Sequence, residues 1–235
     1  MNQEADQEFL SPSQAIPSYL QETYWWAYVH PNAVRFFERQ WLVNLILWGN
    51  FARLRDAALA ELGSDLTGRT LQIACVYGNF STHLAARVAP GGRLDVVDVL
   101  PVQLRNLRAK LPAAAPVTLH QCDSAALDFA DASYDQAIVF FLLHEQPADA
   151  RRQTLREALR VLKPGGRLVI VDYHLPRRLH PLRYLFRPLL AVLEPFALDL
   201  WRHDIARWLP DGVTSAQMRK ETYYGGLYQK LVVTK

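Results

Sequence analysis

The stretch Thr70–Ser81, TLQIACVYGNFS, constrains the fold of this chain more than any other part of the sequence. Apolar, β-forming residues run into a turn at Cys75–Gly78, and a helical pattern follows the turn directly. A strand that ends in a tight turn and opens a helix is the first unit of a nucleotide-binding α/β sheet. A second apolar strand ends in Asp98, 20 residues after Gly78, which is the spacing expected of a carboxylate that binds a ribose diol.

Strand and helix patterns then alternate as far as residue 173, which predicts a doubly wound, mostly parallel sheet with helices on both faces. Residues 214–235 indicate two further strands that meet at Gly225–Gly226, so the sheet should end in an antiparallel hairpin. We therefore predict an α/β fold with a seven-stranded sheet. The five predicted parallel strands are 70–74, 93–98, 117–122, 134–142 and 167–173, and the predicted helices between them are 79–89, 101–110 and 149–162.

Two segments lie outside this alternation. Residues 1–15 indicate a loose arm, and apolar residues at every third or fourth position predict one long helix over 33–62. The segment 175–210 combines arginines with many leucines and is interrupted by prolines, which predicts short helical pieces. We expect an N-terminal arm and helical lid over 1–62, and a cofactor-binding domain over 63–235 with a helical insert at about 175–210.

Both segments leave two interpretations open. Arginines flank the apolar residues of 33–62 and of 175–210, so each segment either packs on the fold or lies in a membrane interface near anionic head groups. An aromatic run before residue 30 either packs as a lid or closes over a flat, apolar substrate. Its aromatic residues are Tyr19, Tyr24, Trp25, Trp26 and Tyr28.

Composition excludes several other classes of protein. The formal charge of +3, with no Lys/Arg-rich block and no C-x-x-C pair, argues against a nucleic-acid partner. The longest apolar run, Trp41–Trp48, is far shorter than the about 20 residues of a spanning helix. The N-terminus is too polar for a secretion signal, and the chain has only two cysteines, so we expect a reducing, cytoplasmic compartment.

Four motifs occur in an order that resembles the class I S-adenosylmethionine-dependent methyltransferases, above all those that modify quinone rings. The motifs are LQIACVYGNFS, VVDV, CDSAALDFADASYDQAIVFFLLHE and ALRVLKPGGRLVIVDYH. The resemblance implies a Rossmann-like fold that binds S-adenosylmethionine. It also implies that Asp98 holds the ribose hydroxyls, that Asp123 with Ser124 lies beside the adenine amino group, and that Gly78 is the surviving glycine of the cofactor turn. The cofactor-binding residues expected on this basis are Val76, Tyr77, Gly78, Asp98, Val99, Asp123 and Ser124.

The turn departs from the pattern of that family. Gln72 stands at the usual acidic position, and Ala74 and Val76 replace glycines. With Tyr77 and the stretch YWWAYVHPNAVRFFERQWLVNLILWGNF, the chain is similar to the RquA rhodoquinone biosynthesis proteins, which descend from methyltransferases. That resemblance implies replacement of a ubiquinone methoxy group by an amino group, with S-adenosylmethionine as nitrogen donor and Mn²⁺ in support. We accordingly expect ubiquinone and a membrane surface as partners, and a peripheral position on the cytoplasmic face of the inner membrane.

The departures suggest how the cofactor is used. Bulk at Val76 and Tyr77 would turn the methionine tail, so that its α-amine faces the quinone in place of its methyl group. The loss of a carboxylate at Gln72 would make that amine more nucleophilic, because an ion pair favours the protonated form. The catalytic candidates are Tyr77, His144 and Asp123.

A metal site is predicted where two neighbouring strands end, because ligands gather at the carboxyl ends of strands in such sheets. His144 and Glu145 follow the fourth strand, and Asp172 and His174 follow the fifth. Imidazole and carboxylate together suit Mn²⁺, which would act as a Lewis acid on a quinone carbonyl. Alternatively, His144 shapes the substrate pocket, Asp172 caps the next loop, and Asp123 meets the metal or the amine.

Two other functions remain open at this point. One is an ordinary quinone or lipid C- or O-methyltransferase that tolerates an unusual turn. The other is a catalytically silent, quinone-binding accessory protein in a membrane complex.

Overall fold

The computed structural model of the chain describes residues 16–23 and 37–235. Its centre is a seven-stranded sheet in the order β3-β2-β1-β4-β5-β7-β6. The first five strands of the chain pair in parallel, whereas β7 is antiparallel to both of its neighbours. The predicted α/β fold with an antiparallel C-terminal hairpin is confirmed. The strands are β1 (Arg69–Ile73), β2 (Arg93–Asp98), β3 (Val117–Gln121), β4 (Tyr134–Phe140), β5 (Leu162–Tyr173), β6 (Met218–Tyr223) and β7 (Tyr228–Thr234).

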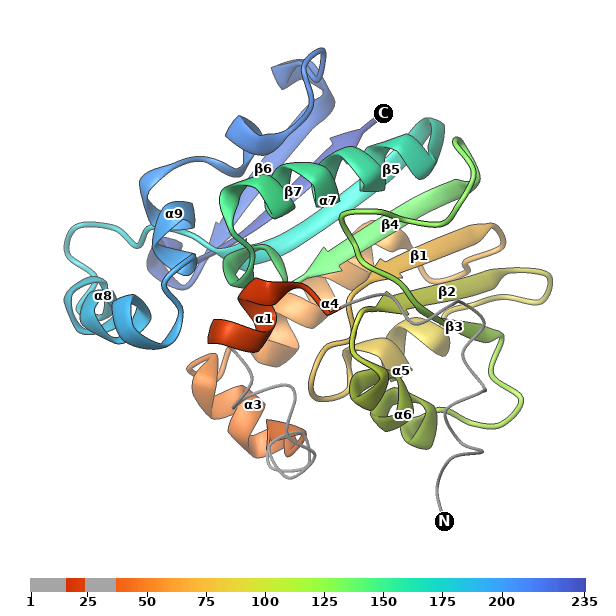
Figure 1. Cartoon of the computed structure of the whole chain (residues 1–235), viewed down its shortest axis with the longest axis horizontal. Coiled ribbons are helices and arrows are strands. Elements are labelled where there is room, and N and C mark those ends of the chain that lie inside the picture. Colours follow the sequence, from red (N-terminus) through yellow and green to blue (C-terminus); the bar gives the residue numbers. More distant parts are fainter. Residues whose placement is uncertain (1–15, 24–36) are drawn as a thin grey trace.

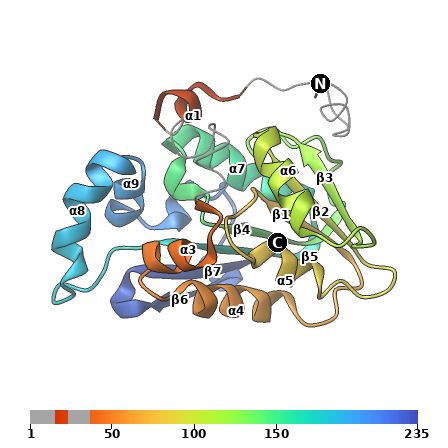
Figure 2. The same cartoon turned by 90° about the horizontal axis from the view of Figure 1, so that it is seen from below.

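Helices cover both faces of the sheet because its central strands are apolar on both sides. In β4, the residues from Ala137 to Phe140 are each at most 1% exposed. Helix α4 packs on one face and α7 on the other, as Figures 1 and 2 show together. The α-helices are α1 (Ser18–Thr23), α3 (Gln40–Ile46), α4 (Phe51–Leu62), α5 (Phe80–Ala85), α6 (Pro101–Lys110), α7 (Ala148–Val161), α8 (Leu182–Leu193) and α9 (Ala197–Arg202). Short 3₁₀ segments are η3 (Leu143–Glu145), η4 (Ile205–Trp208), η5 (Ser215–Gln217) and η6 (Tyr224–Gly226).

The segment predicted as one helix over 33–62 contains two separate helices, α3 and α4, within its described part. Trp48 has a φ of 51° and Gly49 a φ of 74°, and a right-handed helix cannot include such residues. The side-chain amide of Asn50 donates to the carbonyl oxygens of Leu47 and Trp48 and closes the turn. The single-helix prediction was wrong because apolar residues recur at helical spacing on both sides of the turn, so the sequence pattern does not reveal the break.

The segment 175–210 forms α8, α9 and η4. These helices, together with α1 and α3, lie beyond the carboxyl ends of the parallel strands (Figure 1). Among residues 16–23 and 37–235, no helix combines the length and apolar character needed to cross a bilayer. Of the aromatic run expected to form a lid, Tyr19 lies on α1. The arm over 1–15 and four members of the run lie outside the described residues: Tyr24, Trp25, Trp26 and Tyr28.

The turn that leads into β2 offers a test of the fold. Gly91 has a φ of 87° with open space around it, whereas a Cβ at Gly92 would overlap the carbonyl oxygen of Leu66. We expect Gly91→Ala to lower the free energy of unfolding by about 1–2 kcal/mol through backbone strain alone. Gly92→Ala should cost about 3 kcal/mol or more, because backbone atoms must move. Urea unfolding of both variants measures the difference, and equal losses would contradict the predicted overlap.

Candidate functional site

A cavity of about 560 Å³ lies where β1, β2 and β4 end, and helices α1, α3 and α8 also contribute to its lining. Its polar side comes from the end of β2, with Asp98, and from the segments that follow β1 and β3, including Asp123. The rest of the lining is mostly apolar and aromatic, with the charged groups of His144, Glu145 and Glu194 set into it. Among its residues are Trp48, Phe141, Tyr173, Phe186, Leu189 and Leu190. A largely apolar cavity with a few convergent polar groups is the usual form of a small-molecule site, and the end of a parallel sheet is its usual place.

The turn after β1 keeps the backbone of a glycine turn without most of its glycines. Ala74 has a φ of 71°, in the left-handed region that glycine adopts at little cost. Gln72 is buried, and its Nε2 donates to the carbonyl oxygen of Ala74 at 2.9 Å and to Ser81 Oγ at 2.8 Å. The amide therefore braces the turn from the position where the resemblance places an acidic residue. Val76 and Tyr77 line the cavity beside it.

Asp98 connects the end of β2 to this turn. Its Oδ2 accepts a hydrogen bond from the backbone nitrogen of Cys75 at 2.8 Å, and its Oδ1 accepts one from Leu100 at 2.8 Å. Burial raises the pKa of Asp98 to about 6, although these backbone donors oppose the shift. At neutral pH the group is mainly a carboxylate in the cavity wall, next to Val99. It can accept hydrogen bonds from a pair of hydroxyl groups.

Asp123 and Ser124 line the cavity in the loop that follows β3. Asp123 Oδ1 accepts a hydrogen bond from the backbone nitrogen of Ala125 at 2.8 Å. Ser124 Oγ lies 2.9 Å from Thr154 Oγ1 and accepts a bond from Gln146 Nε2 at 3.0 Å. The loop is thus held against α7.

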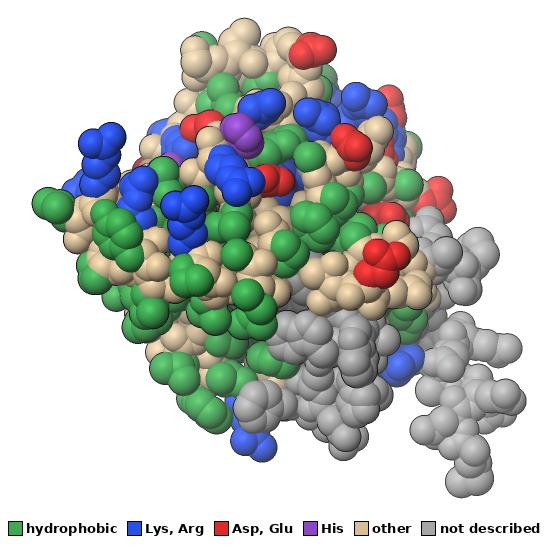
Figure 3. Space-filling view, turned by 60° about the vertical axis from the view of Figure 1, so that its left-hand side comes forward, with side chains coloured by type: hydrophobic (Ala, Val, Ile, Leu, Met, Phe, Trp, Pro, Cys, Tyr) green, Lys and Arg blue, Asp and Glu red, His purple; other side chains and the backbone are tan. Residues whose placement is uncertain are grey.

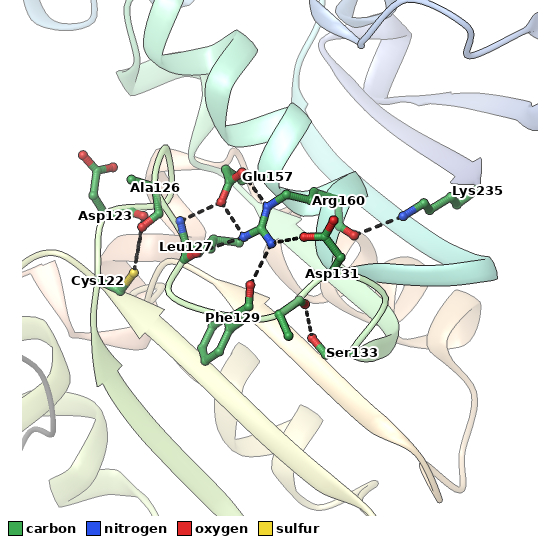
Figure 4. A network of polar contacts seen from close by, with 11 residues as sticks. Cys122, Asp123, Ala126, Leu127, Phe129, Asp131, Ser133, Glu157, Arg160 and Lys235 are labelled. Carbon is green, nitrogen blue, oxygen red and sulfur yellow. Dashed lines mark hydrogen bonds and ion pairs between the residues drawn. The ribbon is translucent and has the colours of Figure 1, made fainter.

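A charged network fixes the far end of the same loop. Arg160 of α7 donates to the carbonyl oxygens of Leu127 and Phe129, and also pairs with Glu157 and Asp131. Figure 4 shows the side chain of Asp123 pointing away from this network. Arg160 and Glu157 therefore anchor the loop without engaging the carboxylate that it presents.

Tyr77 is held by neighbours from two other elements. Its ring stacks on Phe37 with a centroid separation of 6.0 Å, and its hydroxyl accepts a hydrogen bond from Gln103 Nε2 at 3.0 Å. Gly78 has a φ of 81° and lies outside the cavity lining. The backbone nitrogen of Gly78 donates to the carboxylate of Glu38 at 3.1 Å. Of the predicted cofactor residues, only Gly78 therefore has a purely structural setting.

His144 and Asp172 form a buried, hydrogen-bonded pair at the ends of β4 and β5. His144 Nδ1 donates to Asp172 Oδ1 at 3.0 Å, while Asp172 Oδ2 accepts from the backbone nitrogen of Leu143 at 2.8 Å. Burial alone would lower the pKa of His144, but the carboxylates of Asp172, Glu194 and Glu145 raise it to about 9. His144 is therefore a cation at neutral pH in the wall of the cavity.

The predicted metal site is not formed by these residues. Asp172 is 0% exposed and lies behind His144, which it orients by hydrogen bonding. His174 Nδ1 lies 2.8 Å from the carbonyl oxygen of Gly226, and its side chain lines a different cavity. Within the described parts of the chain, no cluster of three or more His, Cys, Asp or Glu side chains could hold a metal ion. The assignment of His144, Glu145, Asp172 and His174 as one ligand set is corrected accordingly, and these residues do not fit Mn²⁺ as a group.

Comparison with known proteins identifies the family. Residues 70–166 match the model of a methyltransferase domain. Over 186 residues the chain is 33% identical to the ubiquinone/menaquinone biosynthesis C-methyltransferase UbiE of Syntrophotalea carbinolica, an alignment that covers 77% of this chain and 75% of that protein. The chain belongs to the class I S-adenosylmethionine-dependent methyltransferases.

Solved structures show the same fold at low sequence identity. The N-methyltransferase NodS of Bradyrhizobium japonicum superimposes with a TM-score of 0.57 at 16% identity, covering 78% of this chain and 95% of that one. The [4+2]-cyclase SpnF superimposes with a TM-score of 0.51 at 18% identity, covering 78% and 80%. The residues present fit S-adenosylmethionine, because carboxylates after β2 and β3 face the cavity where the family holds ribose and adenine.

Three residues important to the site were not among the sequence predictions. Glu38 binds the Gly78 backbone, and Tyr173 and Glu194 line the cavity. Glu194 is the only acidic residue in the apolar stretch 182–196, and that isolation was a usable signal. No comparable signal marked Glu38, because its partners come from distant parts of the chain.

Binding of S-adenosylmethionine should depend on the charge of Asp98. We expect Asp98→Asn to weaken binding at least about tenfold, because a charged acceptor makes stronger hydrogen bonds than an amide. In the unmodified protein the affinity should fall as the pH decreases through about 6, because protonation removes the charge. Calorimetric titration between pH 5 and 8 measures both effects. If the affinity of Asp98→Asn for S-adenosylmethionine still falls through pH 6, the pH dependence belongs to another group.

The Asp172 carboxylate should hold the proton on His144. We expect Asp172→Asn to lower the pKa of His144 from about 9 to below its ordinary value, since burial then outweighs the remaining carboxylates. Histidine-labelled NMR titration measures this directly, with Asp199→Asn on the surface of α9 as the control. In the unmodified protein the raised pKa stabilises the fold fully below about pH 6.5, and this contribution is lost as the pH rises through 9. A His144 pKa unchanged by Asp172→Asn would contradict the assignment.

Proposed function

We propose that this protein converts ubiquinone to rhodoquinone, replacing a ring methoxy group with an amino group whose nitrogen comes from S-adenosylmethionine. The ring C–N bond forms as the methoxy group leaves as methanol, and the Cα–N bond of the methionine portion then breaks with loss of a Cβ proton, so that the nitrogen stays on the ring. One observation carries the proposal. The side chains of Val76 and Tyr77 form part of the cavity wall at the cofactor turn, where glycine-like residues would leave it open. Their bulk favours a turned methionine tail, with the α-amine directed at the ring in place of the sulfonium methyl.

A quinone substrate is supported by the shape and chemistry of the cavity. Its aromatic and aliphatic side, which includes Phe141 and Phe186, suits a flat ring that carries an apolar tail. The UbiE relative is named for ubiquinone and menaquinone biosynthesis. The two observations are independent, and both favour a lipid quinone.

The environment of Gln72 supports an amine nucleophile. Gln72 is fully buried, and its amide nitrogen bonds Ala74 and Ser81, so the group that braces the cofactor turn carries no negative charge. A carboxylate here would stabilise the protonated amine, which has no lone pair to donate. Its replacement by a neutral amide favours the reactive form.

The fold permits chemistry other than methyl transfer. The structural neighbour SpnF is described as a [4+2]-cyclase, although it shares this architecture. A common fold therefore does not settle which group is transferred.

His144 has a defined role in this proposal. Addition of an amine to a quinone ring moves negative charge onto a carbonyl oxygen, and a fixed cationic donor stabilises that charge. His144 is a buried cation, and Asp172 fixes its orientation through Nδ1. Its Nε2 lies 3.7 Å from Glu145 Oε1 in the cavity wall, and a quinone carbonyl bound there would accept its N–H. Asp172 acts through His144 as a positioning residue.

We derive no step through Mn²⁺, because the candidate ligands do not converge. A requirement for Mn²⁺ remains a prediction from the resemblance alone. Comparison of nitrogen transfer with and without added Mn²⁺ tests it.

Methyl transfer to a quinone is the second candidate function, favoured by the identity with UbiE. Asp98 and Asp123 line the cavity as expected for either reaction. In the two candidate reactions a different group of the cofactor faces the acceptor: the α-amine in amination and the sulfonium methyl in methylation.

An isotope experiment separates the candidates. Ubiquinone is incubated with S-adenosylmethionine labelled with ¹⁵N at the α-amine, and the quinone product is analysed by mass spectrometry. We expect ¹⁵N in the ring and loss of the methoxy group. Added methyl mass would establish the methyltransferase, and no product with or without Mn²⁺ would indicate a silent quinone-binding protein. Both outcomes would overturn the proposal.

Variants of Tyr77 test the steric argument. Tyr77→Gly should lower the rate of nitrogen transfer by about tenfold or more, because the methionine tail is no longer held in the turned position. Tyr77→Phe is the matched control, since it keeps the ring against Phe37 and removes the hydroxyl that contacts Gln103. It should retain most of the activity. An undiminished rate in Tyr77→Gly would show that side-chain bulk does not select the amine.

A further inference from the structure

Helix α8 has an apolar surface wider than the face it buries, and Arg183 and Arg187 lie one turn apart on the remaining side. Its inner residues, Leu182, Phe186 and Leu190, are buried against the fold. Its outward residues include Leu185 at 58% and Val192 at 78% exposure. Apolar helix residues outside a buried face are normally covered by a partner or by lipid. Among the described residues, the fold buries only one side of α8.

Helix α3 extends this exposed surface. Trp41 and Leu45 are 58% and 64% exposed, and Trp48 after the helix contacts Phe186 of α8 with ring centroids 5.7 Å apart. We call this surface the α3–α8 face, and Figure 3 shows apolar side chains gathered across this end of the molecule. It consists of Trp41, Leu45, Ile46, Trp48, Leu179, Tyr184, Leu185, Leu189, Val192 and Leu193. A contiguous apolar surface of this extent marks an interaction site.

The cavity opens within the α3–α8 face. Five residues both line the cavity and belong to the exposed surface, so they form its rim: Leu45, Ile46, Trp48, Leu189 and Leu193. A molecule that leaves the cavity between α3 and α8 therefore meets this apolar surface before it meets bulk water.

Basic residues border the face on one side (Figure 3). Arg177, Arg178 and Arg183 line a second cavity of about 400 Å³ beside α8, together with His174, Arg202 and His203. Among the described residues of that lining, Asp204 is the single carboxylate. It is occupied by an ion pair with Lys220 at 2.6 Å. Helix α8 itself contains two arginines and no acidic residue.

We propose that the α3–α8 face docks on an anionic lipid bilayer, with the arginine-lined cavity holding lipid phosphate groups and the rim of the main cavity facing the acyl chains. Apolar side chains bordered by cationic ones match the interfacial layer of such a membrane. The charge selects a bilayer over a second copy of the chain, because two copies would bring basic borders toward each other. The proposal deepens the proposed function, since a long-tailed quinone would then enter directly from the bilayer. On this view the protein acts peripherally, on the cytoplasmic face of the inner membrane.

The test is co-sedimentation of the full chain with vesicles, without S-adenosylmethionine or quinone, so that catalysis plays no part. We expect binding to phosphatidylcholine vesicles that contain phosphatidylglycerol, and at least about tenfold weaker binding to phosphatidylcholine alone. Leu185→Ser combined with Val192→Ser should weaken binding to both, because these exposed side chains lie outside the cavity lining. Arg177→Gln combined with Arg178→Gln should abolish the preference for anionic lipid. Arg152→Gln combined with Arg156→Gln on α7 is the matched control and should bind normally.

Failure of docking is distinguishable from failure of the proposed function. The Leu185/Val192 variant should lose turnover with long-tailed ubiquinone in vesicles and keep it with a short-tailed, water-soluble ubiquinone. Equal vesicle binding by this variant and the unmodified protein would overturn the docking proposal. So would a stable dimer that the same two substitutions dissociate. If the protein binds vesicles but turns over neither quinone, the docking proposal is supported and the proposed reaction is refuted.

Discussion

Parallel pairing of β1 with both β2 and β4 decides where chemistry can take place in this protein. Because the three strands run in the same direction, the segments that follow them meet at one edge of the sheet. The turn after β1, Asp98 at the end of β2 and His144 after β4 are far apart in sequence and face one cavity for this reason. The helices from the N-terminal region and from 175–210 then close that edge.

The cavity joins two charged groups whose pKa values are raised for opposite reasons. Asp98 is buried, and hydrogen bonds from Leu100 and Cys75 do not offset the loss of hydration, which favours its neutral form. His144 is just as buried, but three carboxylates outweigh the cost of removing its charge from water. Between pH 6 and 9 the cavity therefore presents the Asp98 carboxylate on the cofactor side and, on the acceptor side, the His144 imidazolium surrounded by carboxylates. A fixed imidazolium N–H can stabilise negative charge that develops on a bound ring.

The chain has more apolar residues than its core holds, and the structure shows where the others lie. Residues that exceed the needs of the core are concentrated on α3 and α8, around the rim of the cavity. The same side chains would serve a lipid surface from outside and a quinone tail from inside. Cavity and surface are thus continuous, and a water-soluble substrate would gain nothing from that continuity.

The sequence by itself determined the sheet, the strand ends and the carboxylate Asp98, because strand periodicity and the spacing around the first turn are local properties. Asp123 was expected only from the family resemblance. The sequence also identified Tyr77 as a bulky replacement in the cofactor turn. It did not show the break at Trp48–Gly49, since apolar residues recur on both sides of a turn made by positive φ angles. Nor did it show that Asp172 binds the His144 ring while His174 turns to Gly226. The contacts of Asp172 and His174 depend on how β4, β5 and the C-terminal hairpin are placed relative to one another. Only the packed tertiary structure decides that placement. Side chains at neighbouring strand ends can share a ligand or bond to each other, and the sequence pattern is the same in both cases.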